Sequence, residues 1–197
     1  MCSFICILIS FIYNNCRQAF KTHSVKSPNF GVENKGWFNW WSDVITETIS
    51  SSVEVEIEEV VLGNISNHLI KFYSTSEGYE VIPDFYPLVN LLSRFDITLG
   101  AISNTDVRVR QVLLQLGIAH YFKFILTSYD AGVLKPHPEI FRRALSESST
   151  PVSPSEALHI GDTLETDYLG SKAAGWSSIL VNPHYEEQFS AAKLRFR

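Results

Sequence analysis

The second half of the chain alternates short β-branched runs with helical stretches, and this alternation limits the fold more than any other sequence feature. Four runs have the length and composition of strands. They are residues 97–103, 122–128, 157–161 and 178–181. The helical patterns lie at residues 87–94, 106–116, 138–146 and 166–174. Because strands joined by helical crossovers run parallel, the sequence predicts an α/β fold with a doubly wound, Rossmann-like parallel sheet.

The preceding part of the chain, residues 16–79, has the pattern of helices. Apolar residues recur at three- and four-residue spacing up to the serines at 50–52, which end the first helix. A second helix is expected over residues 53–73, and the glutamates at 54–59 are expected to form its solvated first turn. The sequence therefore predicts three parts. They are an apolar segment at residues 1–15, a helical domain at 16–80 and an α/β core at 81–197.

An apolar run at residues 4–12 opens the chain and is rich in Ile and Phe. It is shorter than the ~20 apolar residues needed to cross a bilayer, so no membrane partner is expected. No Lys or Arg precedes the run and no small-residue cleavage site follows it, which argues against a secretory signal. Apolar character on both faces is typical of a central parallel strand, so the sequence predicts a buried strand here.

The charge and the cysteine content argue against nucleic-acid-binding proteins and against proteins held together by disulfides or zinc. Sixteen Lys and Arg stand against 21 Asp and Glu, for a net charge of −5, and no basic run is longer than Arg142-Arg143. The sequence therefore predicts no nucleic-acid partner. The three cysteines, Cys2, Cys6 and Cys16, are clustered and odd in number. This pattern argues against a disulfide framework and a zinc site. It indicates buried apolar thiols in a reducing, cytoplasmic compartment.

Polar residues follow three of the four predicted strands. Ser103 and Asn104 stand at the end of the first, and Lys135 follows the second within a short turn. Asp162 and Asp167 follow the third. Ligands of parallel sheets bind at the carboxyl ends of strands, where a lysine and a hydroxyl suit a phosphoryl group and carboxylates suit Mg²⁺. Taken singly, each residue has a structural alternative as a helix cap, a turn former or a surface lysine.

Three ordered motifs resemble those of the haloacid dehalogenase superfamily. They are ISNTDVR at residues 102–108, GVLKPHPEIF at 132–141 and HIGDTLETDYLGSKAAG at 159–175. Residues 16–31, followed by Trp40 and Trp41, are similar to the helical cap of its members. The resemblance implies an α/β core with a helical cap, and Mg²⁺-dependent hydrolysis of a small phosphorylated metabolite.

The resemblance also implies roles for individual residues. Ser103 and Lys135 would be the catalytic residues of the second and third motifs. Ser103, Asn104 and Lys135 would bind the phosphoryl group of the substrate. Asp162 and Asp167 would hold Mg²⁺. Oligomeric state and substrate identity are not encoded in these motifs.

One departure from the superfamily pattern bears on activity. The nucleophile of these enzymes is the first Asp of an Asp-x-Asp pair after the opening strand, whereas here no two aspartates lie two residues apart and the first is Asp43. One hypothesis is a hydrolase whose site still binds phosphate and metal. The other is a catalytically silent binding or interaction module, a pseudoenzyme, or an incomplete product of a hydrolase gene. Residues 4–12 are expected to replace the opening strand and to bring Asn14 or Asn15 near the nucleophile position.

Overall fold

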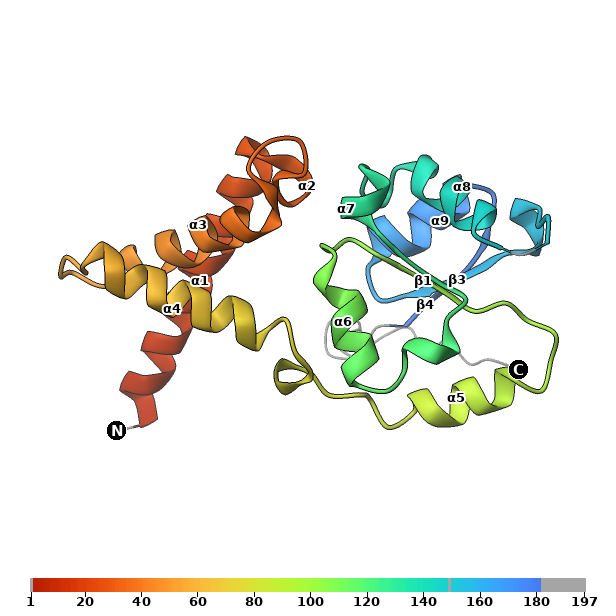
Figure 1. The fold of residues 1–197 in the computed structure, drawn as a ribbon, viewed down its shortest axis with the longest axis horizontal. Helices are drawn as coiled ribbons and strands as arrows, with labels where there is room; N and C mark the ends of the chain where they lie inside the picture. The colour runs from red at the N-terminus through yellow and green to blue at the C-terminus, as the bar shows by residue number, and fades with distance from the viewer. Residues whose placement is uncertain (1, 149, 182–197) are drawn as a thin grey trace. The chain divides into compact units, whose positions relative to one another are not determined.

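The computed structural model of the protein describes residues 2–148 and 150–181 (Figure 1). The chain divides into two compact units. The first unit is Met1–Gly132 and the second is Val133–Arg197. Both contain parallel strands connected through helices, as the sequence predicts. Among the described residues, no helix is long and apolar enough to cross a membrane.

The first unit begins with helices that build their own core. They are α1 (Cys2–Lys26), α2 (Pro28–Gly31), α3 (Gly36–Ser50) and α4 (Glu59–Phe72). Helix α3 packs against both α1 and α4, and the core between α1, α2 and α3 is formed by Ala19, Phe30, Trp40 and Val44. The Trp40 ring is buried, and its Nε1 is satisfied there by two backbone oxygens, those of His23 at 3.2 Å and Ser27 at 2.9 Å.

Residues 4–12 are helical, so the prediction of a replacement strand is wrong. Neither Gly nor Pro occurs between Cys2 and Lys26, and nothing in the sequence ends the helix before Ser27 and Pro28. The side chain of Asn15 donates to the backbone oxygen of Ser51 at 3.0 Å, at the end of α3. The N-terminal segment therefore belongs to the helical part, and Asn15 lies in a helix–helix contact rather than at a strand end.

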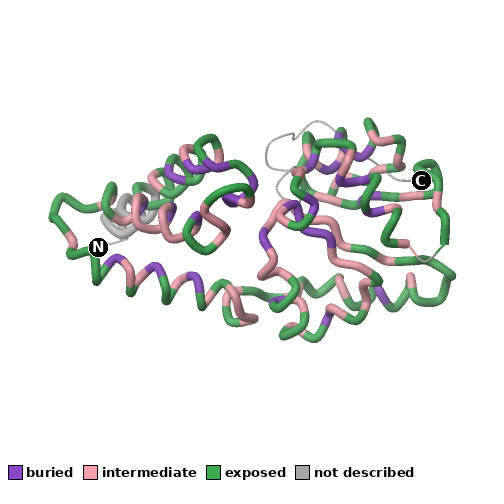
Figure 2. The backbone as a smooth tube through the Cα atoms, turned by 45° about the horizontal axis from the view of Figure 1, so that its top comes forward, coloured by how far each residue is buried: buried purple, intermediate pink, exposed green. Residues whose placement is uncertain are grey.

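Two further details of the helical part differ from expectation. Helix α4 starts at Glu59 rather than at residue 53, although the glutamates at 54–59 are exposed as predicted. Buried positions on α4 recur every four residues, at Leu62, Ser66 and Ile70 (Figure 2). Cys16 is exposed, which contradicts the expected buried thiol, because α1 buries the positions of Ala19 and His23 instead.

The rest of the first unit contains one parallel strand pair. Its elements are η1 (Ser76–Gly78), α5 (Phe85–Leu92), β1 (Gly100–Ser103), α6 (Arg108–Gln115), η2 (Ala119–Tyr121), β2 (Phe124–Thr127) and α7 (Ser128–Ala131). In the β1–β2 register Gly100 lies opposite Phe124 and Ser103 lies opposite Thr127. A Cβ on Gly100 would stand 2.1 Å from the Phe124 ring, so this strand start has room only for glycine.

The second unit contains the other parallel pair. Its elements are α8 (Pro138–Ser146), η3 (Pro154–Glu156), β3 (Leu158–Gly161), η4 (Leu164–Leu169), α9 (Gly170–Ala173) and β4 (Ser177–Leu180). Helix α8 buries Ile140 and Phe141 completely. The Phe141 ring contacts the rings of His159 and Trp176 edge-on, with centroids 5.5 and 5.6 Å apart. The predicted helix at 166–174 is divided, because η4 is a π-helical turn that passes into α9.

The four strands lie where the sequence predicts them, but they are paired as β1–β2 and β3–β4 rather than as one sheet. The sequence predicts a fifth strand at residues 4–12, but these residues are helical. Within the described residues no other strand is present to join the pairs. The described strands therefore form two parallel pairs, one in each unit, and the predicted parallel α/β character is confirmed.

Candidate functional site

The loop after β1 carries the first two predicted site residues, Ser103 and Asn104, both partly buried. The backbone oxygen of Thr105 accepts from the backbone N–H of Tyr129 and from Oγ of Ser128, each at 3.3 Å. These bonds attach the loop to the start of α7, which follows the neighbouring strand β2. The Ser103 side chain is thus placed at a strand end whose backbone is held by an adjacent element.

The same loop continues into a buried ion pair that the sequence analysis did not identify. Asp106 is 1% exposed, and its carboxylate accepts from the backbone N–H, Nε and NH2 of Arg108 at 3.1, 2.8 and 2.8 Å. Nε1 of Trp41, on α3, donates to the same carboxylate at 2.8 Å. The carboxylate is buried, which opposes ionisation, but the Arg108 contacts outweigh this effect and hold the pKa of Asp106 below its ordinary value.

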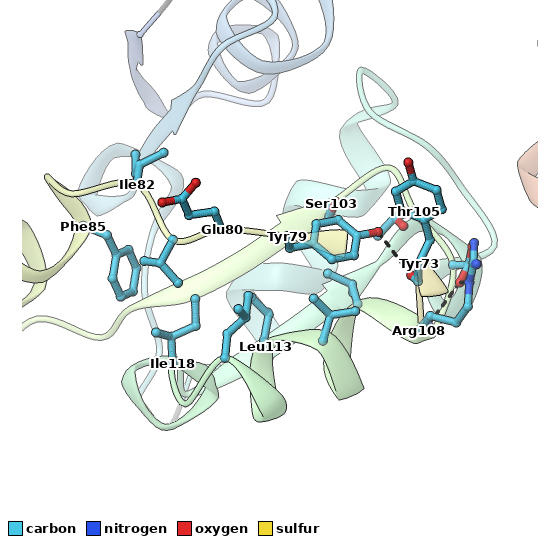
Figure 3. A pocket seen from close by; sticks show the side chains of 15 residues that line it. Tyr73, Tyr79, Glu80, Ile82, Phe85, Ser103, Thr105, Arg108, Leu113 and Ile118 are labelled. Atoms are coloured by element: carbon cyan, nitrogen blue, oxygen red, sulfur yellow. Dashed lines mark hydrogen bonds and ion pairs between the residues drawn. The ribbon is translucent and has the colours of Figure 1, made fainter. Parts of the chain in front are cut away.

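A cavity of about 410 Å³ lies beside this loop, within the first unit (Figure 3). Ser103 and Thr105 contribute hydroxyls to its lining, Leu113 and Ile118 contribute apolar surface, and Tyr79 lies across its middle. Burial raises the pKa of Tyr79, so this phenol stays protonated at neutral pH. The cavity lining thus combines the Ser103 and Thr105 hydroxyls with apolar and charged side chains.

The second unit brings together two other predicted site residues, Lys135 and Asp167. Nζ of Lys135 donates to Oδ1 of Asp167 at 2.6 Å, and both residues are buried. Nε2 of His159, on β3, lies 3.1 Å from the same oxygen. The backbone N–H of Thr163 donates to Oδ2 of Asp167 at 3.0 Å. The carboxylate of Asp167 is therefore the centre of a cluster formed by a lysine, a histidine and a backbone amide.

The charges in this cluster are set by competition between burial and pairing. Burial opposes ionisation of Asp167, but the bonds from Lys135 and His159 outweigh it and hold the pKa of the carboxyl below its ordinary value. For His159 burial prevails over the Asp167 contact and lowers the pKa of the imidazole. The two pKa shifts therefore favour an ionised Asp167 beside an uncharged His159.

Asp162 directly follows β3 and is exposed. Oγ1 of Thr163 donates to its Oδ1 at 3.3 Å. The neighbouring Gly161 permits the cluster to form, because a Cβ there would stand 2.4 Å from Cγ of Asp167. In the third motif the Asp162 carboxylate is therefore exposed, whereas the Asp167 carboxylate packs against Gly161 at the end of β3.

The residues available to a divalent cation are two carboxylates. Mg²⁺ commonly takes one or two protein carboxylates and keeps several waters. Asp162 is exposed, and Oδ2 of Asp167 accepts a single hydrogen bond, from Thr163. In the described part of the chain, no group of three or more His, Cys, Asp or Glu is placed to hold a metal ion. Carboxylate oxygens such as those of Asp162 and Asp167 are of the ligand type that Mg²⁺ accepts.

The predicted site residues thus lie on two units. Ser103 and Asn104 are on the first unit, and Lys135, Asp162 and Asp167 are on the second. The sequence analysis missed Asp106, Arg108 and His159. One pattern points to Asp106 and Arg108. They are an acidic and a basic residue two positions apart directly after a strand, and such a pair can bond to each other and contact a tryptophan ring.

The fold and these strand-end residues define an α/β protein of parallel strands with a helical cap. The family model of haloacid dehalogenase-like hydrolases matches residues 11–175. The chain belongs to the haloacid dehalogenase-like hydrolase family.

Individual relatives agree with this assignment. The chain is 30% identical over 180 residues to haloacid dehalogenase-like hydrolase domain-containing protein 3 of Xenopus laevis, covering 91% of this chain and 72% of that protein. It is 36% identical over 163 residues to the rhythmically expressed gene 2 protein of Drosophila melanogaster, covering 79% and 62%. The chain therefore spans less than two thirds of the fly protein's length.

The fold is also similar to that of the HAD-hydrolase YfnB from Bacillus subtilis, whose structure was solved bound to magnesium. The TM-score is 0.63, and the match covers 90% of this chain and 81% of that one at 20% identity. At this identity the likeness establishes the shared fold. It also shows that a protein of this fold binds Mg²⁺.

Proposed function

We propose that this chain is a phosphate-binding member of the family with negligible phosphatase turnover. The family's general activity supplies the ligand class, a small phosphorylated metabolite. Ser103, Asn104 and Lys135 are the proposed phosphoryl-binding residues, and Asp162 and Asp167 are the proposed Mg²⁺ ligands. The proposed domain division keeps the helical cap at residues 16–80 and the α/β core at 81–197.

The buried Lys135 is the observation that carries the proposal. Burying an ammonium is costly unless it is paired, and Asp167 pairs it at 2.6 Å. The pair fixes the lysine side chain before any ligand arrives, so less conformational entropy is lost on binding. An ammonium has three N–H donors, and phosphate oxygens are strong acceptors for such donors.

Three aspartates that follow the strands are engaged by neighbouring side chains, and this supports the absence of turnover. Covalent phosphatase chemistry needs an activated carboxylate nucleophile. Asp106 is held by Arg108 and Trp41, and Asp167 by Lys135. Asp130 accepts from Oγ1 of Thr127 and pairs with Arg110 at 2.8 Å. An oxygen whose lone pairs are engaged in this way is poorly placed to attack phosphorus.

Asp162 is the exposed carboxylate of the set and is the principal proposed metal ligand. Asp167 would contribute Oδ2, since its Oδ1 is bonded to Lys135. Bound Mg²⁺ would neutralise part of the phosphoryl charge. Metal binding is expected to be weak because one of the two ligands is already paired with a lysine.

Titration of the purified chain with inorganic phosphate, followed by ³¹P NMR with and without Mg²⁺, tests the proposal. Lys135→Met should weaken phosphate binding by about tenfold or more, since a hydrogen bond to a charged group is lost. Lys172→Met is the matched control, because this exposed lysine bonds only to the Tyr168 hydroxyl at 2.8 Å among the described side chains. Ser103→Ala, which leaves the Lys135–Asp167 pair intact, provides a second variant that should also bind more weakly. Equal affinity of the parent, Lys135→Met and Ser103→Ala would refute the proposal.

The alternative is a non-catalytic protein-interaction module. Apolar side chains at Leu88, Leu91, Phe95 and Ile97 are 44%, 51%, 59% and 51% exposed, on α5 and just after it. Exposed apolar side chains gathered in one segment are typical of an interaction surface. If the parent chain binds neither phosphate nor Mg²⁺ in the titration, this alternative is favoured.

A further inference from the structure

An indole of the helical cap donates a hydrogen bond to the loop that follows Ser103. Trp41 lies on α3, and its Nε1 donates to Oδ2 of Asp106 at 2.8 Å. Asp106 lies three residues after Ser103 in the loop that leaves β1. A residue of the cap therefore supplies a hydrogen bond to the loop that carries the proposed phosphoryl-binding serine.

Both oxygens of the Asp106 carboxylate accept two hydrogen bonds each. Its Oδ1 accepts from the backbone N–H and Nε of Arg108, and its Oδ2 accepts from NH2 of Arg108 and Nε1 of Trp41. The bond to the backbone N–H is an ordinary turn contact, which Asn or Ser could also make. The bonds from the guanidinium and the indole exceed what a local turn requires. The carboxylate therefore links the cap to the loop.

Arg108 makes a second link between the same two elements. Its guanidinium carbon lies 4.9 Å from the ring centroid of Trp37 and 5.4 Å from that of Trp41. The Arg108 side chain is only 13% exposed, so these cation–π contacts are partly desolvated and correspondingly stronger. Two residues of the loop thus contact two tryptophans that lie one turn apart on α3.

The loop also bonds to the start of α7. Ser128 and Tyr129 bond to the backbone oxygen of Thr105, and the backbone oxygen of Ser128 accepts from Nδ2 of Asn29, on α2, at 2.7 Å. The loop between Ser103 and Asp106 is therefore held between cap residues and the start of α7. Loss of one contact should loosen the loop locally without unfolding the unit.

We propose that Trp41, Asp106 and Arg108 are positioning residues through which the cap sets the conformation of the Ser103 loop for phosphate binding. This inference rests on the proposed function, because it assigns the cap a role at that same site. None of the three residues needs to touch the ligand. Their effect is transmitted through the backbone between Ser103 and Asp106.

A matched pair of tryptophan variants tests the inference. Trp41→Phe keeps an aromatic ring beside Arg108 and removes the indole donor to Asp106. Trp40→Phe makes the same chemical change at the next position, where the lost bonds go to His23 and Ser27 inside the cap. The readouts are amide hydrogen exchange at residues 103–106, global unfolding by urea, and phosphate affinity by ³¹P NMR.

Trp41→Phe should speed amide exchange at residues 103–106 by about tenfold and should weaken phosphate binding. Trp40→Phe should lower global stability but leave amide exchange at residues 103–106 near that of the parent. Equal changes in both variants, or no local change in Trp41→Phe, would overturn the inference. If Trp41→Phe does not fold, Arg108→Lys replaces it, because lysine cannot make the two-point contact with Asp106. The same faster exchange at residues 103–106 and weaker phosphate binding are expected for this variant. A parent chain that binds no phosphate would defeat the proposed function, while the exchange measurement would still decide whether Trp41 positions the loop.

Discussion

Lys135 and Asp167 form a buried ion pair, with Nζ of the lysine 2.6 Å from Oδ1 of the aspartate, although 32 residues separate them along the chain. Lys135 precedes α8 and Asp167 lies in the π-helical turn after β3. The pair therefore joins two motifs of the second unit. His159 adds a third side chain to the same oxygen.

A double-mutant cycle should show strong coupling within this pair. Lys135→Met leaves a buried carboxylate without its cation and should cost ~3–5 kcal/mol in the free energy of unfolding. Lys135→Met combined with Asp167→Asn should cost clearly less than the sum of the single changes. Urea unfolding of the four proteins measures the coupling. Strictly additive effects would show that the pair contributes no interaction energy of its own.

Glycine at position 161 is required by the close approach of Asp167. Gly161→Ala would place a Cβ 2.4 Å from Cγ of that residue, so the carboxylate must move and the cluster must loosen. We expect a loss of ~1–3 kcal/mol in unfolding free energy. Gly63→Ala, in α4 with no atom within 4 Å of the added Cβ, is the control and should stabilise by ~0.5–1 kcal/mol. A neutral Gly161→Ala variant would contradict the packing described here.

Asp106 should give the chain a measurable acid sensitivity. Burial alone would raise the pKa of this carboxyl, but Arg108 holds it below the ordinary value in the folded chain. Its stabilising effect is therefore fully present above the unfolded pKa, about 3.9, and is lost as the pH falls from there through the folded pKa. Compared with Asp106→Asn, the parent should lose more unfolding free energy between neutral pH and pH 3. Parallel pH profiles of the two proteins would contradict this expectation.

Metal affinity should depend more on Asp162 than on Asp167. Asp162 is exposed, whereas Asp167 is engaged by Lys135. Mn²⁺ titration followed by paramagnetic broadening should show weak binding that Asp162→Asn abolishes. Glu165→Gln, which alters another exposed carboxylate in the same turn, serves as the control. Unchanged broadening in Asp162→Asn would remove this residue from the proposed metal site.

The strands could be predicted from sequence because each is a short β-branched run bounded by turn residues. For β4 the prediction of residues 178–181 differs from the observed Ser177–Leu180 by one position. Residues 4–12 could not be assigned in the same way, since an apolar run of that length suits a buried strand or a buried helix equally. Their conformation follows from the uninterrupted helical sequence that continues to Lys26.

Part of the candidate site was also predictable from sequence, because its motifs are local features of the chain. Motif spacing identifies Lys135 and Asp167 as site residues that follow β2 and β3, although helix α7 lies between β2 and Lys135, where the sequence predicts only a short turn. Their direct contact and the participation of His159 depend on how α8, β3 and the following turn pack together. The contact of Trp41 with Asp106, 65 residues apart, likewise depends on tertiary packing that periodicity does not encode.

Steady-state hydrolysis of p-nitrophenyl phosphate by the purified chain with Mg²⁺ tests the central claim most directly, namely that this family member binds phosphate without covalent turnover. Loss of a nucleophile lowers rates by about 10⁶ from typical values near 10 s⁻¹, so we expect turnover of about 10⁻⁵ s⁻¹. Turnover above about 1 s⁻¹, abolished in Lys135→Met, would contradict the account by showing that the chain contains a working nucleophile.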